Sequence, residues 1–121
     1  MKERLKHHSI SFKNAFTGLF WAFKTQPNFL IHFTLSALTI IAGIVLQISY
    51  LEMTIIIFTI VLGLSAEMVN TAIEAMTDLI KKEYSQEAKI AKDVSAGMML
   101  LTAFGAIFVA GCILLPHIVN F

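Results

Sequence analysis

The sequence predicts an all-α membrane protein, in which one amphipathic helix lies at the membrane surface and three further helices cross the bilayer. Composition is the first observation behind this prediction. Of 121 residues, 57% are hydrophobic and 14% are charged, whereas soluble domains are about half apolar and about a quarter charged. The second observation is that the apolar residues form three long runs. A chain of this length is expected to form a single domain, residues 1–121.

The three apolar runs predict transmembrane helices at about residues 27–47, 52–80 and 88–118. The first run holds no charge over residues 29–46, a length near the lower limit of about 17–25 residues for a spanning helix. The second is apolar or small over residues 53–66, and helical patterning continues to residue 80 with one polar face. A soluble three-helix core is the alternative, and it would need a polar face on every helix. Residues 35–46, 53–64 and 98–115 offer almost none, so lipid is the expected solvent.

An amphipathic helix is predicted before the first span, at about residues 9–24. Its apolar residues recur at helical spacing, namely Phe12, Ala15, Phe16, Leu19 and Phe23. Its polar residues fall on the other side, namely Lys13, Asn14, Thr17 and Lys24. A helix with these two faces is typical of one that lies in the membrane interface. The alternative is a soluble helix packed on protein.

The basic residues predict the orientation in the membrane. All nine lie in the N-terminal segment or in the loop after the second span, and residues 47–52 hold none. Two spans separate the basic segments, so both lie on one side, and the positive-inside rule makes that side the cytoplasm. We therefore expect the N-terminus and residues 81–92 to be cytoplasmic and the C-terminus to lie outside. The bilayer is an expected partner, and nucleic acid is not.

A stripe of polar residues marks the cytoplasmic end of the second span. At about 100° per residue, Glu67, Asn70, Glu74 and Asp78 fall within a sector of about 80°. Carboxylates at membrane depth are costly unless they are paired, bound to metal or facing a polar cavity. The stripe therefore predicts a divalent-cation site, a general base or both. The alternative is that this end of the helix leaves the bilayer and is solvated.

A second polar cluster opens the third span and consists of Lys89, Lys92, Asp93 and Ser95. Lys92 and Ser95 are three residues apart, so they face roughly the same way on a helix. The free N–H groups at a helix start favour anions, and Lys92 adds a full charge. The alternative is a positive-inside signal with nothing bound. Together the two clusters suit magnesium with polyphosphate, although the chain has no GxxxxGK[ST] loop.

These motifs resemble the bacterial diacylglycerol kinase and undecaprenol kinase family. The resemblance rests on Glu67-Met-Val-Asn70-Thr-Ala-Ile-Glu74 with Asp78, on Glu83-Tyr84, and on Ala91-Lys92-Asp93, and it extends from about residue 9 to Pro116. It implies a homotrimer in the bacterial cytoplasmic membrane, with an interfacial helix and three spans in each chain. It also implies ATP- and magnesium-dependent phosphorylation of a lipid alcohol, diacylglycerol or undecaprenol, at the cytoplasmic interface.

The resemblance also implies roles for individual residues. Glu67 is the expected catalytic base. The expected ATP-binding residues are Asn14, Gln26, Glu74, Glu83, Tyr84, Lys92 and Asp93, and those expected to hold magnesium are Glu74 and Gln26. The positions expected on the lipid-substrate side are Asn70, Ser95 and Ala96.

Departures from the family pattern at Gln26 and Ala96 bear on the expected activity and substrate. Gln26 stands where the family has a second metal-binding glutamate, and its neutral amide is expected to weaken magnesium binding or lower activity. Ala96 stands where diacylglycerol-type members have a serine, which favours undecaprenol, as does the Thr25…Asn28…Ile31-His32 pattern. Two alternatives remain: an inactive member or membrane scaffold, and a component of a proton or cation pathway. The pathway would need polar residues through the bilayer, but residues 53–64 supply only two threonines.

Overall fold

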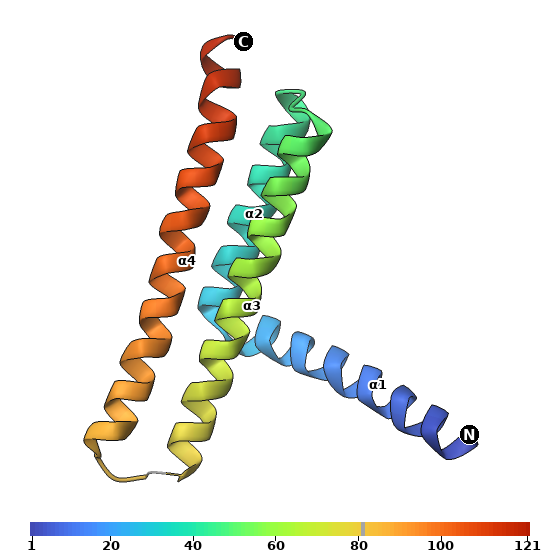
Figure 1. Ribbon diagram of the computed structural model, residues 1–121, viewed down its shortest axis with the longest axis vertical. Coiled ribbons are helices and arrows are strands. Elements are labelled where there is room, and N and C mark those ends of the chain that lie inside the picture. The colour runs from blue at the N-terminus through green and yellow to red at the C-terminus, as the bar shows by residue number, and fades with distance from the viewer. Residues whose placement is uncertain (81) are drawn as a thin grey trace.

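The computed structural model describes residues 1–80 and 82–121, with the side chains of residues 5–10 excepted. It contains the helices α1 (Lys2–Thr25), α2 (Pro27–Val45), α3 (Tyr50–Ile80) and α4 (Gln86–Val119). The last three lie alongside one another, and α1 extends away from them (Figure 1). All three are long and apolar enough to cross a membrane, so the predicted fold class is confirmed. α1 begins well before residue 9, because lysine, glutamate and arginine form helix readily without any apolar periodicity.

The direction of α1 is set by an elbow at Gln26 and Pro27. Proline disfavours helical backbone in the residue before it, and Gln26 is accordingly extended, with φ −104° and ψ 104°. The Gln26 N–H still donates to the Ala22 carbonyl oxygen at 2.9 Å and closes α1. Pro27 then opens α2, where its missing N–H leaves no hydrogen bond unmade. The chain therefore changes direction within one residue.

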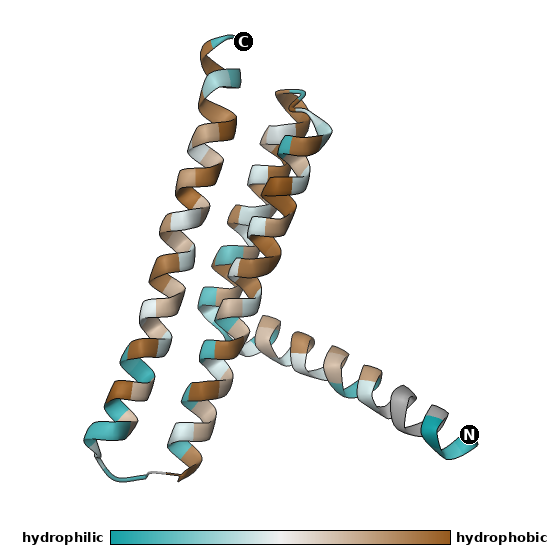
Figure 2. Ribbon diagram, viewed as in Figure 1, coloured by the Kyte–Doolittle hydropathy of each residue, from teal (hydrophilic) through white to brown (hydrophobic). Residues whose placement is uncertain are grey.

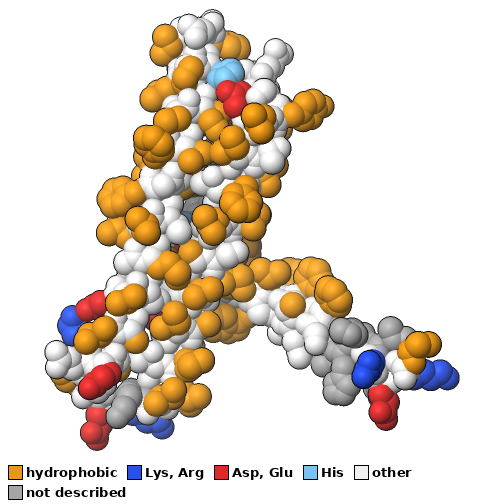
Figure 3. Space-filling model, viewed as in Figure 1, with side chains coloured by type: hydrophobic (Ala, Val, Ile, Leu, Met, Phe, Trp, Pro, Cys, Tyr) orange, Lys and Arg blue, Asp and Glu red, His pale blue; other side chains and the backbone are white. Residues whose placement is uncertain are grey.

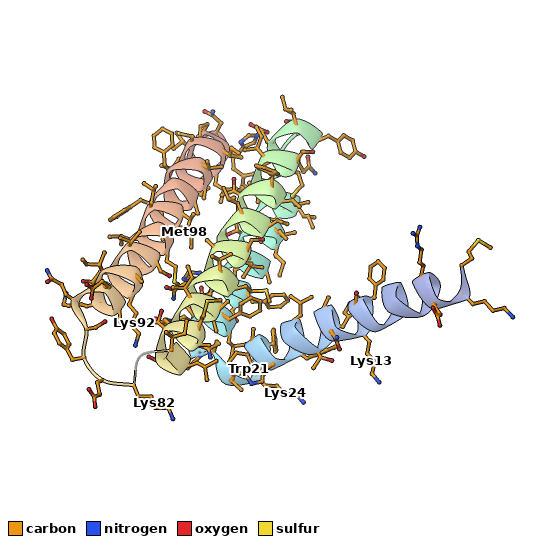
Figure 4. The ribbon with its side chains drawn as sticks, turned by 60° about the horizontal axis from the view of Figure 1, so that its bottom comes forward. Lys13, Trp21, Lys24, Lys82, Lys92 and Met98 are labelled. Atoms are coloured by element: carbon orange, nitrogen blue, oxygen red, sulfur yellow. The ribbon has the colours of Figure 1, made fainter. Side chains whose placement is uncertain are left out.

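Aromatic rings pack against one another across the elbow, and no such packing is found elsewhere among the side chains of α1 that the structure describes. The Phe23 ring packs edge-on against Phe29 and Phe33, with centroid distances of 6.3 Å and 5.2 Å. Phe12 and Phe16, farther along α1, are 68% and 59% exposed. Lys13 and Lys24 project from one side of the same helix (Figure 4). An uncovered apolar face opposite a basic one suits a helix lying in the membrane interface.

The lengths of the spanning helices differ in a way that matters for the site. α2 has 19 residues, whereas α3 and α4 have 31 and 34. At about 1.5 Å per residue, α2 matches a hydrocarbon core of about 30 Å, and the other two exceed it by several turns. Hydrophilic residues gather on the excess length near the α3–α4 loop (Figure 2). On the visible face, hydrophobic side chains cover the bundle above it (Figure 3).

The opposite end of the bundle is closed by the short α2–α3 connection. Gln47 has φ 55°, and Ser49 and Glu52 form a reciprocal cap on α3. The Ser49 N–H donates to Glu52 Oε2 at 2.8 Å, and the Glu52 N–H donates to Ser49 Oγ at 3.2 Å. His117 Nε2, near the end of α4, lies 3.6 Å from Glu52 Oε2. Polar side chains therefore join α3 to α4 at this end of the bundle. It is far from the polar stripe that is predicted to form the functional site at the other end of α3.

α3 is the central helix of the bundle. It packs against α4 along most of its length and against α2, while α2 and α4 touch little. Few apolar side chains are buried within the described part of the chain, and most large ones point outward. Such a surface would aggregate in water but is the normal outer surface of a helix bundle in lipid.

Candidate functional site

The buried polar side chains lie together where α2, α3 and α4 meet. Glu67, Asn70 and Ser95 are 3%, 8% and 4% exposed, and they are the buried polar residues of the part that the structure describes. Ser95 Oγ on α4 donates a hydrogen bond to Asn70 Oδ1 on α3. His32 Nδ1 on α2 lies 2.8 Å from Glu67 Oε2. We refer to these four residues as the polar layer, which links the three spanning helices.

The Glu67 carboxylate has an unusual environment within this layer. Its Oε2 atom is enclosed, and no described group donates to it in hydrogen-bonding alignment. The 2.8 Å contact with His32 has the length of a hydrogen bond without its direction. A buried carboxylate with unused accepting capacity is costly in a structural role. A group that must accept a proton during catalysis needs that capacity.

A cleft lies beyond the polar layer, where α3 ends and α4 begins. Its volume is about 410 Å³. Its lining residues are Thr77, Asp78, Lys82, Glu83, Tyr84, Ser85, Ala88, Lys89, Lys92 and Asp93. Lys92 Nζ is 2.5 Å from Asp78 Oδ1, and both side chains are substantially exposed. Figure 4 shows Lys92 directed from α4 toward the end of α3, whereas Lys82 points away from both helices.

The start of α4 is organised by local hydrogen bonds. Ser85 is the N-cap, and its Oγ accepts from the Ala88 N–H at 3.1 Å. Lys89 and Asp93 pair across one helical turn at 2.5 Å. Lys92, between them in sequence, instead turns toward α3. Free helix-start N–H groups and a lysine thus lie at the same cleft, an arrangement that suits an anion.

A magnesium ion would find a partial ligand set here. Glu74 is exposed on α3 between Asn70 and Asp78. No group of three or more histidine, cysteine or acidic side chains converges on one point in the described ranges. A dedicated cage is thus absent from those ranges, but magnesium usually takes one or two carboxylates and completes its shell with phosphate oxygens and water. Glu74 would supply such a carboxylate, whereas Gln26 lies at the elbow between α1 and α2, where its amide contacts Thr25.

The structure brings some of the predicted site residues together and keeps others apart. Those that line the cleft are Glu83, Tyr84, Lys92 and Asp93, and those in the polar layer are Glu67, Asn70 and Ser95. Ala96 is exposed on α4. Asn14 is exposed on α1, which extends away from α3 and α4 (Figure 1). The Gln26 amide lies at the elbow, where its Nε2 donates to Thr25 Oγ1 at 3.5 Å.

Two features of the site were not assigned from the sequence. The position of His32 within the first apolar run favours a packing or hydrogen-bonding role over a ligand role, and in the structure His32 contacts Glu67. Asp78 was placed on the acidic stripe without a partner, and it pairs with Lys92. The inward position of His32 could have been inferred from its spacing in the sequence. His32 lies three residues after Phe29 and four residues before Ser36, so the three share the face of α2 that is turned inward.

The interior of the bundle offers no continuous polar path along the described helices. A groove of about 330 Å³ runs from His32 toward the far end between α2, α3 and α4. Four hydroxyl groups line it, on Ser36, Thr39, Thr59 and Thr102. Each donates to a backbone carbonyl of its own helix. With their protons engaged in this way, these hydroxyls do not form a relay, and the geometry gives no support to an ion pathway.

Similarity to known proteins indicates the family of this chain. Residues 13–114 match the profile of the prokaryotic diacylglycerol kinase family. A diacylglycerol kinase of Synechocystis is 38% identical over 92% of this chain, and the match spans 64% of that protein. An undecaprenol kinase of Bacillus subtilis is 33% identical over 97% of this chain and 95% of its own length. The chain belongs to the prokaryotic diacylglycerol kinase family.

Proposed function

We propose that this protein transfers the γ-phosphoryl group of ATP to the hydroxyl of a membrane lipid at the cytoplasmic face of a bacterial membrane. One observation carries the proposal. The buried Glu67 carboxylate, which has an oxygen atom without a hydrogen-bond donor, and the cleft lined by lysine side chains follow one another along the same end of α3. Glu67 and Asp78 are separated by eleven residues, which corresponds to about 16 Å along a helix. That distance accommodates a hydroxyl at Glu67 and a polyphosphate between it and Lys92.

Helix lengths support an interfacial position for Glu67. If α3 enters the hydrocarbon core at Tyr50, Glu67 lies about 26 Å along the helix at about 1.5 Å per residue. The core is about 30 Å thick, so Glu67 would lie just inside its inner boundary. Its contact residue, His32, is in the second turn of α2, near the elbow from which α1 spreads. A lipid hydroxyl reaches this depth by lateral diffusion, and ATP reaches the cleft from the water.

Each group in the proposed site has a distinct role. Glu67 accepts the proton of the lipid hydroxyl. Lys92 binds the polyphosphate, Glu83, Tyr84 and Asp93 line the nucleotide site, and Glu74 and Gln26 hold magnesium. When bound with ATP, magnesium would neutralise the charge of the polyphosphate. Phosphoryl transfer needs little beyond positioning and charge stabilisation, which are the roles assigned to these residues.

The lipid substrate is tested directly by offering the purified protein diacylglycerol and undecaprenol in mixed micelles with magnesium and labelled ATP. We expect label on one lipid alcohol, and we expect undecaprenol to be preferred because position 96 lacks a side-chain hydroxyl. The two relatives named above divide between these lipids, so both arms are needed. Label on neither lipid would remove the proposed function.

We further propose that the working unit is a homotrimer, the number that the family resemblance implies. Asn14 extends away from the cleft of its own chain, and no described contact joins Gln26 to Glu74. A second copy whose α1 reaches the cleft would complete both the nucleotide and the magnesium ligands. Light scattering in detergent should give the mass of three chains, and a fully active monomer would exclude the trimer.

Gln26→Glu is expected to lower the magnesium concentration needed for half-maximal activity by about tenfold, because ligand charge sets the affinity of such oxygen sites. The same shift should appear in magnesium binding to the ATP complex measured by calorimetry, which is independent of turnover. Gln26→Asn is the control, because it keeps a neutral amide. A silent parent that becomes active only as Gln26→Glu would instead mark the natural chain as an inactive member.

A further inference from the structure

We infer that His32 is a positioning residue for Glu67, whose carboxylate it holds through one oxygen while the other oxygen faces the lipid hydroxyl. The inference rests on the proposed kinase function and deepens it by giving a positioning role to His32, which appears in the family pattern quoted above without a role of its own. Its basis is the 2.8 Å contact between His32 Nδ1 and Glu67 Oε2. Both residues lie at the inner end of the spanning region, on different helices.

The packing of α2 on α3 fixes His32 in this place. Phe29 and Gly43 are the buried residues of α2, and His32 and Ser36 lie between them on the same face, partly covered. Gly43 allows close approach at the far end, where a Cβ would meet Ile48 Cδ1 at 2.8 Å. At the near end, Phe29 packs against Phe23 of α1. The two ends hold the helix, so His32 cannot move far from α3 without disturbing both.

The Glu67 carboxylate has one polar side-chain contact in the described part of the chain, and that contact is His32. A glutamate has several rotatable bonds, and its last torsion angle is broad. Without a partner the carboxylate would move among several positions in the polar layer. A general base must reach the substrate hydroxyl at about 2.6–3.2 Å. A displacement of about 1 Å can cost about 10²-fold in rate.

The identity of the nitrogen decides how the contact is tested. The contacting atom is Nδ1, which is two bonds from Cβ and is matched by the side-chain nitrogen of asparagine. The other ring nitrogen, Nε2, is matched instead by the side-chain nitrogen of glutamine. The χ2 angle of histidine is broad, so the ring can rotate at little cost toward a position in which an Nδ1–H points at Oε2. A donor at the Nδ1 position should therefore suffice, and a donor at the Nε2 position should not.

The experiment compares His32→Asn, His32→Gln and His32→Leu in the mixed-micelle kinase assay. We expect kcat for His32→Asn to stay within about fivefold of the parent. We expect kcat for His32→Gln and His32→Leu to fall by about 10²-fold, as for a misplaced catalytic group. KM for ATP should not change, because His32 is outside the cleft. Thr34→Val is the control, since Thr34 is exposed on α2 and its hydroxyl donates to the Leu30 carbonyl.

The outcomes separate this inference from the proposed function. An active parent whose Asn and Gln variants have equal kcat, or whose Leu variant keeps the parental kcat, overturns the positioning role and leaves the kinase function intact. A parent that phosphorylates neither lipid overturns both. Circular dichroism and elution volume check folding, and if the Leu variant is misfolded the Asn and Gln pair still decides. A rise in KM for ATP equal to the fall in kcat would also contradict a role that acts through Glu67.

Discussion

Replacing Glu67 by Gln is expected to reduce kcat for lipid phosphorylation by about 10³-fold, the size of effect seen when a general base is removed. The amide has nearly the shape of the carboxylate but cannot accept the proton of the lipid hydroxyl. Folding should survive, because Glu67 is buried and a neutral side chain avoids the cost of burying a charge there. Turnover is measured with labelled ATP in mixed micelles, and folding by thermal unfolding in the same detergent.

A matched control for this variant lies on the same helix. Glu52→Gln makes the same chemical change fifteen residues earlier, at the opposite end of the span. Glu52 caps α3 through Ser49 and lies near His117, so its replacement is expected to affect stability and not kcat. If Glu67→Gln keeps kcat within tenfold of the parent, Glu67 is not the base.

Replacing Lys92 by Met is expected to lower kcat/KM for ATP by about 10²-fold, because a charge-assisted hydrogen bond contributes about 1.5–3 kcal/mol. In the free protein Lys92 pairs with Asp78. That pair is exposed, and exposed pairs contribute about 0–1 kcal/mol, so a polyphosphate can displace Asp78 at little cost. The stability of the protein should therefore change little. The measurement is the dependence of the initial rate on ATP concentration at fixed lipid.

Lys24→Met provides the comparison for Lys92. It removes the same charge from the end of α1, outside the residues that line the cleft. Its KM for ATP is expected to stay near the parental value. If the two variants lost kcat/KM for ATP equally, the overall positive charge near the membrane would be what attracts ATP. Lys92 would then have no specific contact with ATP.

The polar stripe on α3 could be predicted from the sequence alone. Glu67, Asn70, Glu74 and Asp78 share one face because helical periodicity is a local property, and the same holds for the two faces of α1. Hydropathy located the three spans for a related reason, since a helix in lipid needs about 20 apolar residues in succession. These features follow from residues near one another in the chain. The assigned roles of Glu74, Asn14 and Gln26 stay predictions.

The contacts between side chains on different helices could not be predicted from the sequence in this way. Ser95 was expected on the lipid-substrate side, and in the structure its hydroxyl donates to Asn70. The Lys92–Asp78 pair and the His32–Glu67 contact join residues 14 and 35 positions apart. Such pairs depend on which faces of α2, α3 and α4 meet.

The sequence by itself determined the helices, their membrane spans and the stripe of acids, because each follows from periodicity and hydropathy over a few turns. Only the tertiary structure decided which neighbour meets each polar side chain and that α1 carries Asn14 away from its own cleft. The physical reason is that the rotation of each helix about its axis, and its height relative to the next, are set by packing between distant segments and by the elbow at Pro27.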